Sequence, residues 1–149
     1  FARTLNNLAW IFGIQNKYPH AISLMKQALE IRKQAFGTDH PYVADSLHDL
    51  SVLYYEQNRI VEAKQYLEQS LTILEKDLGT DHPTVADYLS RLALYYQAQG
   101  NYNKAKTLYE RILRIYKRTL VPEHPKVEKV RKRYTAILPK VKPKSKRKR

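Results

Sequence analysis

The octapeptide GTDHPTVA at residues 79–86 repeats an earlier octapeptide, GTDHPYVA, at residues 37–44. A weaker copy, VPEHPKV, follows at residues 121–127. The His-Pro pair therefore recurs at positions 40, 82 and 124, with a constant spacing of 42 residues. Internal periods of about 20 to 50 residues are typical of proteins that stack one helical unit on the next. We therefore expect the chain to be an array of repeats.

Two amphipathic helices are predicted in each repeat. Residues 5, 8, 9 and 12 place apolar side chains at the spacing of one helical face, and the same face returns at 47, 50, 51 and 54 and at 89, 92, 93 and 96. A second apolar stripe begins after a short polar turn, at Tyr18, Ile60 and Tyr102. An alanine at positions 21, 63 and 105 lies where the second helix should cross the first, so the two axes can approach to about 8–10 Å. Each unit is thus predicted to be a helix hairpin.

The repeated octapeptide has the composition of a joint between helices. Gly37 and Gly79 follow the second helix of a unit, where a left-handed backbone costs glycine least. The aspartates two residues later are expected to accept hydrogen bonds from the free backbone amides that begin the next helix. The prolines four residues after each glycine suit the first helical turn, which needs no amide hydrogen. We predict that the octapeptide ends one helix and starts another.

The sequence lacks the motifs that catalysis or metal binding would require. The chain has no cysteine, which excludes thiolate nucleophiles and cysteine-bound zinc. Stacked units place equivalent histidines on the order of 10 Å apart, whereas the ligands of one zinc ion lie about 2 Å from it. The His-Pro histidines are therefore expected to serve helix starts. Because phosphate-binding glycine loops and Gly-x-Ser-x-Gly motifs are also missing from the sequence, we predict no enzyme activity, no metal, no cofactor and no small-molecule substrate.

The net charge of +13 is concentrated at the end of the chain. Residues 126–149 contain twelve Lys and Arg and one Glu. We expect residues 139–149 to be a disordered basic tail, because they have too little apolar content to order themselves. Its cations could contact phosphates or another anionic partner, act as a nuclear import signal, or only keep the chain soluble. These cations are Lys140, Lys142, Lys144, Lys146, Arg147, Lys148 and Arg149.

Three features together resemble the tetratricopeptide repeats (TPR) of kinesin light chains: the motif LNNLA at residues 5–9, the pair Tyr18 and Ala21, and the octapeptide at 42-residue spacing. The resemblance covers roughly residues 1–128. It implies an all-α fold, a right-handed α-α superhelix of three TPR helix hairpins at about residues 1–36, 41–78 and 83–120, with a capping helix at 125–138. It also implies a protein-interaction scaffold or adaptor whose first helices line a concave groove for a partner peptide.

In that family, the asparagines of the LNNLA motif hold the peptide backbone, and only Asn6 and Asn7 match here. The second unit reads LHDLS at residues 47–51 and the third reads LSRLA at residues 89–93. The related class that binds chaperone C-termini needs basic and amide side chains on successive first helices, a role that the acidic residues Asp45, Asp49 and Asp87 oppose.

Helical spacing places a further set of residues together on the first-helix faces. With the family's asparagines, the candidate groove residues are Arg3, Asn6, Asn7, Trp10, Asp45, His48, Asp49, Val52, Asp87, Arg91 and Leu94. Our hypothesis is a peptide with an apolar residue near Trp10 and a basic residue opposite Asp45 and Asp49. The alternative is that these are ordinary solvated positions.

Two classes of function stay open at this point. The first is the scaffold, with a protein or peptide ligand in the groove. The second is an anionic-surface binder, in which the basic tail contacts nucleic acid, tubulin or lipid. No apolar run is long enough for a transmembrane segment, and a cytoplasmic location is expected, with a nuclear one as the alternative given by the tail. Because Phe1 enters the periodic pattern directly, we expect the sequence to begin inside a longer protein.

Overall fold

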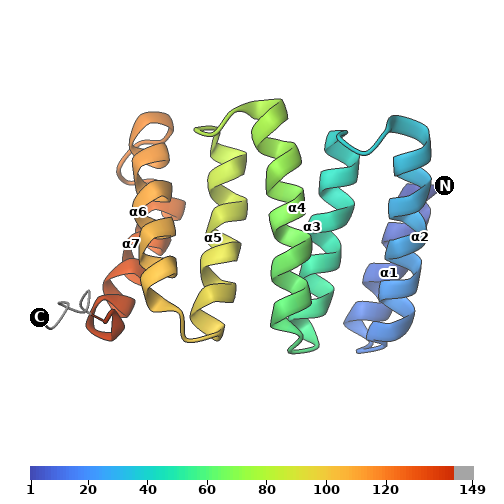
Figure 1. The fold of residues 1–149 in the computed structure, drawn as a ribbon, viewed down its shortest axis with the longest axis horizontal. Coiled ribbons are helices and arrows are strands. Elements are labelled where there is room, and N and C mark those ends of the chain that lie inside the picture. The colour runs from blue at the N-terminus through green and yellow to red at the C-terminus, as the bar shows by residue number, and fades with distance from the viewer. Residues whose placement is uncertain (143–149) are drawn as a thin grey trace, which may run out of the picture. The chain divides into compact units, whose positions relative to one another are not determined.

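The computed structural model describes residues 1–142, which contain seven α-helices, one short 3-10 helix and no β-strand (Figure 1). The helices are α1 (Ala2–Ile14), α2 (Tyr18–Phe36), α3 (Pro41–Glu56), α4 (Ile60–Leu78), α5 (Pro83–Ala98), α6 (Tyr102–Thr119), α7 (Pro125–Ile137) and the 3-10 helix η1 (Leu138–Lys140). The expected all-α fold of three helix hairpins and a final helix is confirmed. The chain divides into two compact units, Phe1–Thr80 and the part from Asp81 onward.

The first unit consists of two hairpins, α1 with α2 and α3 with α4, and α2 also packs against α3 (Figure 1). Its core is made of side chains from all four helices, among them Leu5, Met25, Leu50 and Leu67. In the second unit α5 pairs with α6, and α7 packs against α6. Three buried tyrosines, Tyr95, Tyr109 and Tyr116, are the largest side chains of the second core.

The predicted crossing and turn positions of the hairpins are confirmed. Ala21, Ala63 and Ala105 are fully buried, as a close approach of paired helices requires. The turn inside each hairpin contains one residue with positive φ: Asn16 at 58°, Asn58 at 61° and Gly100 at 74°. Asparagine and glycine are the residues that adopt this conformation at least cost. The same turn is therefore built three times, at 42-residue intervals.

The joint between hairpins is built differently from the prediction at one point. The N-cap side chains of α3, α5 and α7 are the histidines at 40, 82 and 124, and each Nδ1 accepts a hydrogen bond from the backbone N–H two residues later, at 3.1 Å. The expectation that the preceding aspartates cap these helices is wrong. Asp39 instead forms an ion pair with Lys76 at 3.5 Å, and Asp81 forms one with Arg118 at 3.7 Å.

Gly37 and Gly79 end α2 and α4 with φ of 85° and 88° and ψ of 171° and 165°. Positive φ at the end of the helix is confirmed. The ψ values lie far from the left-handed helical region, in a part of conformational space that is open essentially to glycine alone. Because a Cβ at either position would meet nothing within 4 Å, it is the backbone conformation that requires glycine there.

One face of α1 differs from its equivalents in the other hairpins. Leu8 is 41% exposed and Ile11 50% exposed, whereas Leu50 and Leu53, 42 residues later, are 0% and 1% exposed. The prediction that Leu8 packs inward is therefore wrong. In the described part of the chain, α3 packs against both α2 and α4, whereas the packing partner of α1 is α2.

The final helix, α7, buries Val127, Val130 and Ile137 and exposes its lysines and Arg131. This arrangement agrees with the predicted solvated end helix. The segment expected to be disordered begins with an ordered turn, because η1 extends to Lys140. Among residues 1–142, none of the helices has the length and apolar content that crossing a membrane requires.

Candidate peptide-binding site

The predicted groove residues of α1 are not equally accessible. Arg3 and Asn7 are exposed and Trp10 is half-buried, so these three are available to a partner. Asn6 is 8% exposed and points into the unit. With its amide oxygen facing Arg32, Asn6 accepts hydrogen bonds from Nη1 at 3.2 Å and Nη2 at 3.1 Å. Asn6 therefore holds its own chain together in this structure.

Arg32 of α2 is a site residue that the repeat pattern of the sequence did not predict. Its Nη1 donates to the Ser46 hydroxyl at 2.8 Å and to the Tyr42 carbonyl at 3.1 Å, and its guanidinium lies 5.7 Å from the Tyr42 ring centroid. The equivalent positions 42 and 84 residues later are the buried apolar side chains Leu74 and Tyr116. An arginine at an apolar repeat position was the available signal. The Arg32 side chain thus links its own helix, α2, to α1 and α3.

Beside Arg32 the first unit has a cavity of about 520 Å³. Its walls come from the start of α1, the end of α2 and the start of α3. The lining residues are Phe1, Ala2, Arg3, Ile31, Arg32, Ala35, Phe36, Tyr42 and Asp45. The rings of Phe36 and Tyr42 meet edge to face, with centroids 5.1 Å apart, and each residue is about half exposed. The cavity thus combines an aromatic wall with charged groups of both signs at its rim.

The two acidic groove residues predicted for the second hairpin lie on its first helix, α3. Asp45 is exposed and Asp49 is half-buried, one helical turn further along. His48 Nδ1 lies 3.6 Å from the Asp49 carboxylate, and Val52 is half-buried one turn beyond. Asp45 belongs both to this carboxylate pair and to the lining of the cavity. Two of the predicted groove residues, Arg3 and Asp45, are therefore joined by one cavity.

The predicted residues of the second unit are partly occupied by their own chain. Asp87 accepts a hydrogen bond from the Tyr116 hydroxyl at 2.6 Å and forms an ion pair with Lys126 at 2.9 Å. Burial, reinforced by the Asp87 carboxylate, raises the pKa of Tyr116 well above its ordinary value. Arg91 and Leu94 are half-buried on the same helix, α5. The carboxylate of Asp87 thus joins α5 to α6 and α7.

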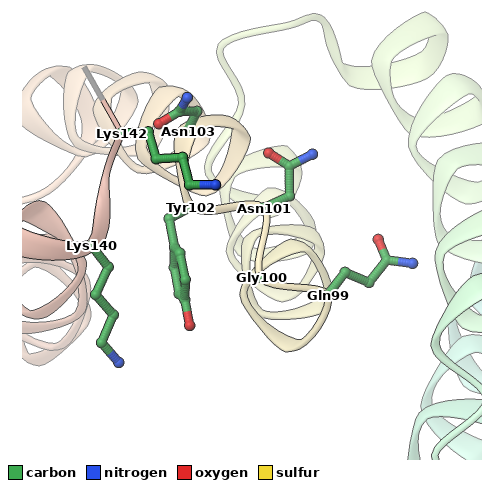
Figure 2. A pocket seen from close by; sticks show the side chains of 7 residues that line it. All are labelled: Gln99, Gly100, Asn101, Tyr102, Asn103, Lys140 and Lys142. Atoms are coloured by element: carbon green, nitrogen blue, oxygen red, sulfur yellow. The ribbon is translucent and has the colours of Figure 1, made fainter. Parts of the chain in front are cut away.

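Two of the predicted tail cations, Lys140 and Lys142, line a cavity of about 540 Å³ in the second unit (Figure 2). The turn between α5 and α6 supplies most of the other lining residues, and Lys140 Nζ lies 5.4 Å from the centroid of the Tyr102 ring. The other five cations, Lys144, Lys146, Arg147, Lys148 and Arg149, lie outside the described residues, so an anionic partner for the tail stays a prediction.

In the described part of the chain, no group of three or more His, Asp or Glu residues could hold a metal ion.

The sequence matches the model of the tetratricopeptide repeat family over residues 1–76 and 59–118. No curated protein matches it. Among solved structures, the chain resembles a protein from Podosopora anserina, described as a kinesin light chain with nearly identical TPR-like repeats, with 28% sequence identity and a TM-score of 0.79. The match covers 90% of this chain and 64% of that protein, so the chain spans less than two thirds of the length of this relative.

Two more distant structures share the fold alone. BtubC from P. vanneervenii has 17% identity and a TM-score of 0.69, over 99% of this chain and 68% of that one. The first TPR of Spaghetti, solved with an HSP90 peptide, has 18% identity and a TM-score of 0.61, over 91% of this chain and 92% of that one. The resemblance to kinesin light chain-type repeats that the sequence suggested is confirmed, and the chain belongs to the tetratricopeptide repeat family.

Proposed function

We propose that this chain is a protein-interaction scaffold that binds a peptide segment of a partner protein on the α1 and α3 surface of its first unit. The observation that carries the proposal is the cavity of about 520 Å³, because it has an aromatic wall for an apolar side chain and charged groups at its rim. Sites that bind a ligand specifically combine apolar lining with a few placed polar groups in this way. In the proposed function the chain has no catalytic role.

The charges of the surface define the peptide that fits it. Asp45 and Asp49 lie one helical turn apart and present two carboxylates, which favour a lysine or arginine of the peptide. The guanidinium of Arg32 is occupied by Asn6, Ser46 and the Tyr42 carbonyl, so it shapes the cavity from within its own chain. We therefore propose a ligand with one apolar anchor residue in the cavity, near Tyr42, and a basic residue nearby that faces the two aspartates. Trp10 supplies a further apolar contact on α1.

The experiment is a selection of peptides from a random display library on the 149-residue chain, followed by affinity measurements on each selected peptide by fluorescence anisotropy. The test variant carries Asp45→Lys and Asp49→Lys. Its matched control carries Glu68→Lys and Asp77→Lys, the same change of charge at exposed positions of α4. We expect about a tenfold loss of affinity in the test variant, as two attractive charge pairs become repulsive, and less than a twofold loss in the control.

The two variants separate a local site from general attraction. If both lost affinity equally, the peptide would be responding to net charge, and the α1 and α3 surface would not be the site. Unchanged affinity in the test variant would mean that the aspartates are ordinary solvated residues. A second variant, Tyr42→Ala, tests the cavity by itself. It is expected to weaken the binding of intact peptides. Peptides that keep the basic residue but lack the apolar anchor should be weakened less.

A further inference from the structure

Helix α6 of the second unit carries three arginines on one face, Arg111, Arg114 and Arg118. They follow one another at intervals of three and four residues, so their side chains leave the helix about one turn apart. Together with Asp81 and Ile115 they line a cavity of about 230 Å³. The cavity lies within the second unit and shares no residue with the peptide-binding surface proposed above.

The other hairpins show that the fold does not require these arginines. The equivalent positions are Gln69, Thr72 and Lys76 in α4, and Gln27, Glu30 and Gln34 in α2. Only the last position has a role common to two hairpins, because Lys76 pairs with Asp39 in the same way as Arg118 pairs with Asp81. The arginines at 111 and 114 are therefore additions of the third hairpin that the helix-packing pattern does not explain.

The arginines are also placed to meet a partner. Arg114 is exposed and makes no hydrogen bond or ion pair with any other residue in the described part of the chain. The ion pair of Arg118 with Asp81 is long, at 3.7 Å, and both side chains are largely exposed. Arg111 is half-buried and contacts its own chain. Around them, Lys and Arg outnumber Asp and Glu by fourteen to five over residues 81–142, which favours the approach of an anion.

We infer that this face of α6 binds an acidic helical segment of a partner protein. Three guanidinium groups at intervals of three and four residues span about 10 Å along α6, at roughly 1.5 Å per residue. A partner helix with carboxylates at the same intervals presents them over the same length. In an extended segment, same-side carboxylates lie about 6.6 Å apart, so three of them span about 13 Å. Arginine is also the residue best suited to bidentate contact with carboxylates.

Nucleic acid is the other polyanion that arginines bind, and two observations favour the acidic helix over it. Every aromatic side chain in residues 81–142 is buried or half-buried, so this unit offers little open ring surface on which bases could stack. The carboxylate of Asp81 lies among the arginines and would repel a phosphate backbone along its length. A helical protein segment can place a neutral residue opposite Asp81 and keep its carboxylates for the arginines.

The test uses a synthetic alanine-based helix with glutamates at intervals of three and four residues, and the same peptide with glutamine at those positions. Binding to the 149-residue chain is measured by fluorescence anisotropy at about 50 mM salt, where exposed charges are screened only weakly. We expect the triple variant Arg111→Gln, Arg114→Gln and Arg118→Gln to bind the glutamate peptide about tenfold more weakly, since each ion pair at the surface is worth roughly a factor of two. The glutamine peptide should bind no better to the wild type than to this variant.

The matched control removes the same number of charges from α7, with Lys129→Gln, Arg131→Gln and Lys132→Gln, all exposed positions. This control is expected to lose less than a factor of two. A gain-of-function variant with Gln69→Arg and Thr72→Arg, beside Lys76, is expected to create a second site on α4 and raise the number of peptides bound from one to two. Positions 69 and 72 are exposed, so arginine can be accommodated there. The second binding site is measured in a separate variant, so this result does not depend on how the triple variant folds.

Three results would overturn the inference. Equal losses in the α6 and α7 variants would show that only net charge matters. Equal binding of the glutamate and glutamine peptides would show that the carboxylates are not recognised. A short DNA duplex that binds more tightly than the peptide, with the same loss in the α6 variant, would assign the arginines to nucleic acid instead.

Discussion

Substitution of the capping histidine of α5, His82→Ala, should remove a hydrogen bond that the sequence pattern assigned to another residue. His82 has extended backbone angles, φ −79° and ψ 142°, and its Nδ1 accepts from the Thr84 N–H at 3.1 Å. Loss of an N-cap side chain typically costs about 1 kcal/mol, within a range of about 0.5–2 kcal/mol. For a chain of this size, that corresponds to a fall in Tm of roughly 2–4 °C.

The equivalent histidine of the preceding hairpin gives an internal comparison. His40 caps α3 with the same geometry, but its ring also stacks on Phe36 at 4.5 Å and lies 4.9 Å from the ring of Tyr42. Aromatic contacts of this kind add about 0.5–1.5 kcal/mol. We therefore expect His40→Ala to cost about 2 kcal/mol, roughly twice the cost of His82→Ala.

The assay is urea denaturation followed by far-UV circular dichroism, with free energies of unfolding obtained by linear extrapolation at an unchanged slope. His82→Asn and His40→Asn are the controls, because asparagine offers a side-chain oxygen to the same backbone amide. Asparagine should restore most of the loss at position 82 and only about half at position 40. Equal costs of alanine and asparagine at position 82 would refute the capping role, and equal costs of alanine at both positions would refute the aromatic contribution.

Three further changes have defined outcomes. Gly79→Ala should cost about 1–3 kcal/mol in thermal unfolding, because φ 88° with ψ 165° strains any side chain, and a loss below about 0.5 kcal/mol would contradict this. Burial raises the pKa of Tyr109 to about 12 from 10.0, so the stability that this tyrosine contributes is complete below pH 10 and is lost as the pH rises toward 12. When the free energy of unfolding is measured across this pH range, it should therefore fall less steeply in Tyr109→Phe than in the wild type. Tyr116→Phe should cost about 1–2 kcal/mol by removing the donor to Asp87, and a neutral result in urea unfolding would show that Lys126 alone satisfies that carboxylate.

The parts of the fold that follow from repetition were predictable, because each position could be read three times. The residues of positive φ in the turns, Asn16, Asn58 and Gly100, occupy one repeat position, and so do the buried alanines of the helix crossings. Apolar periodicity and turn chemistry agree at these positions in every copy. When local preferences and packing point to the same conformation, sequence alone is sufficient to place an element.

Other features depend on competition between side chains, which a pattern does not resolve. Both Asp81 and His82 could accept the first amides of α5; the histidine does so, and the aspartate pairs with Arg118 on a helix thirty-seven residues further along. Leu8 and Leu50 occupy the same repeat position, yet only Leu50 is buried, on a helix that packs against two others in the described part of the chain. In the candidate site, Arg3 and Asp45 were predicted, whereas the cavity that joins them also depends on Arg32 of α2, whose partners come from α1 and α3.

The short turns at Asn16, Asn58 and Gly100 also bear on how the chain acquires its structure during synthesis. Each turn brings two helices together that are neighbours in sequence, so most helix contacts join residues that are close along the chain. Chains with such local contacts fold quickly, because little loop entropy is lost before a contact forms. A hairpin has its own partner helix as soon as about forty residues have left the ribosome. The nascent chain can therefore fold one hairpin at a time. Little apolar surface then stays exposed until later helices are synthesised.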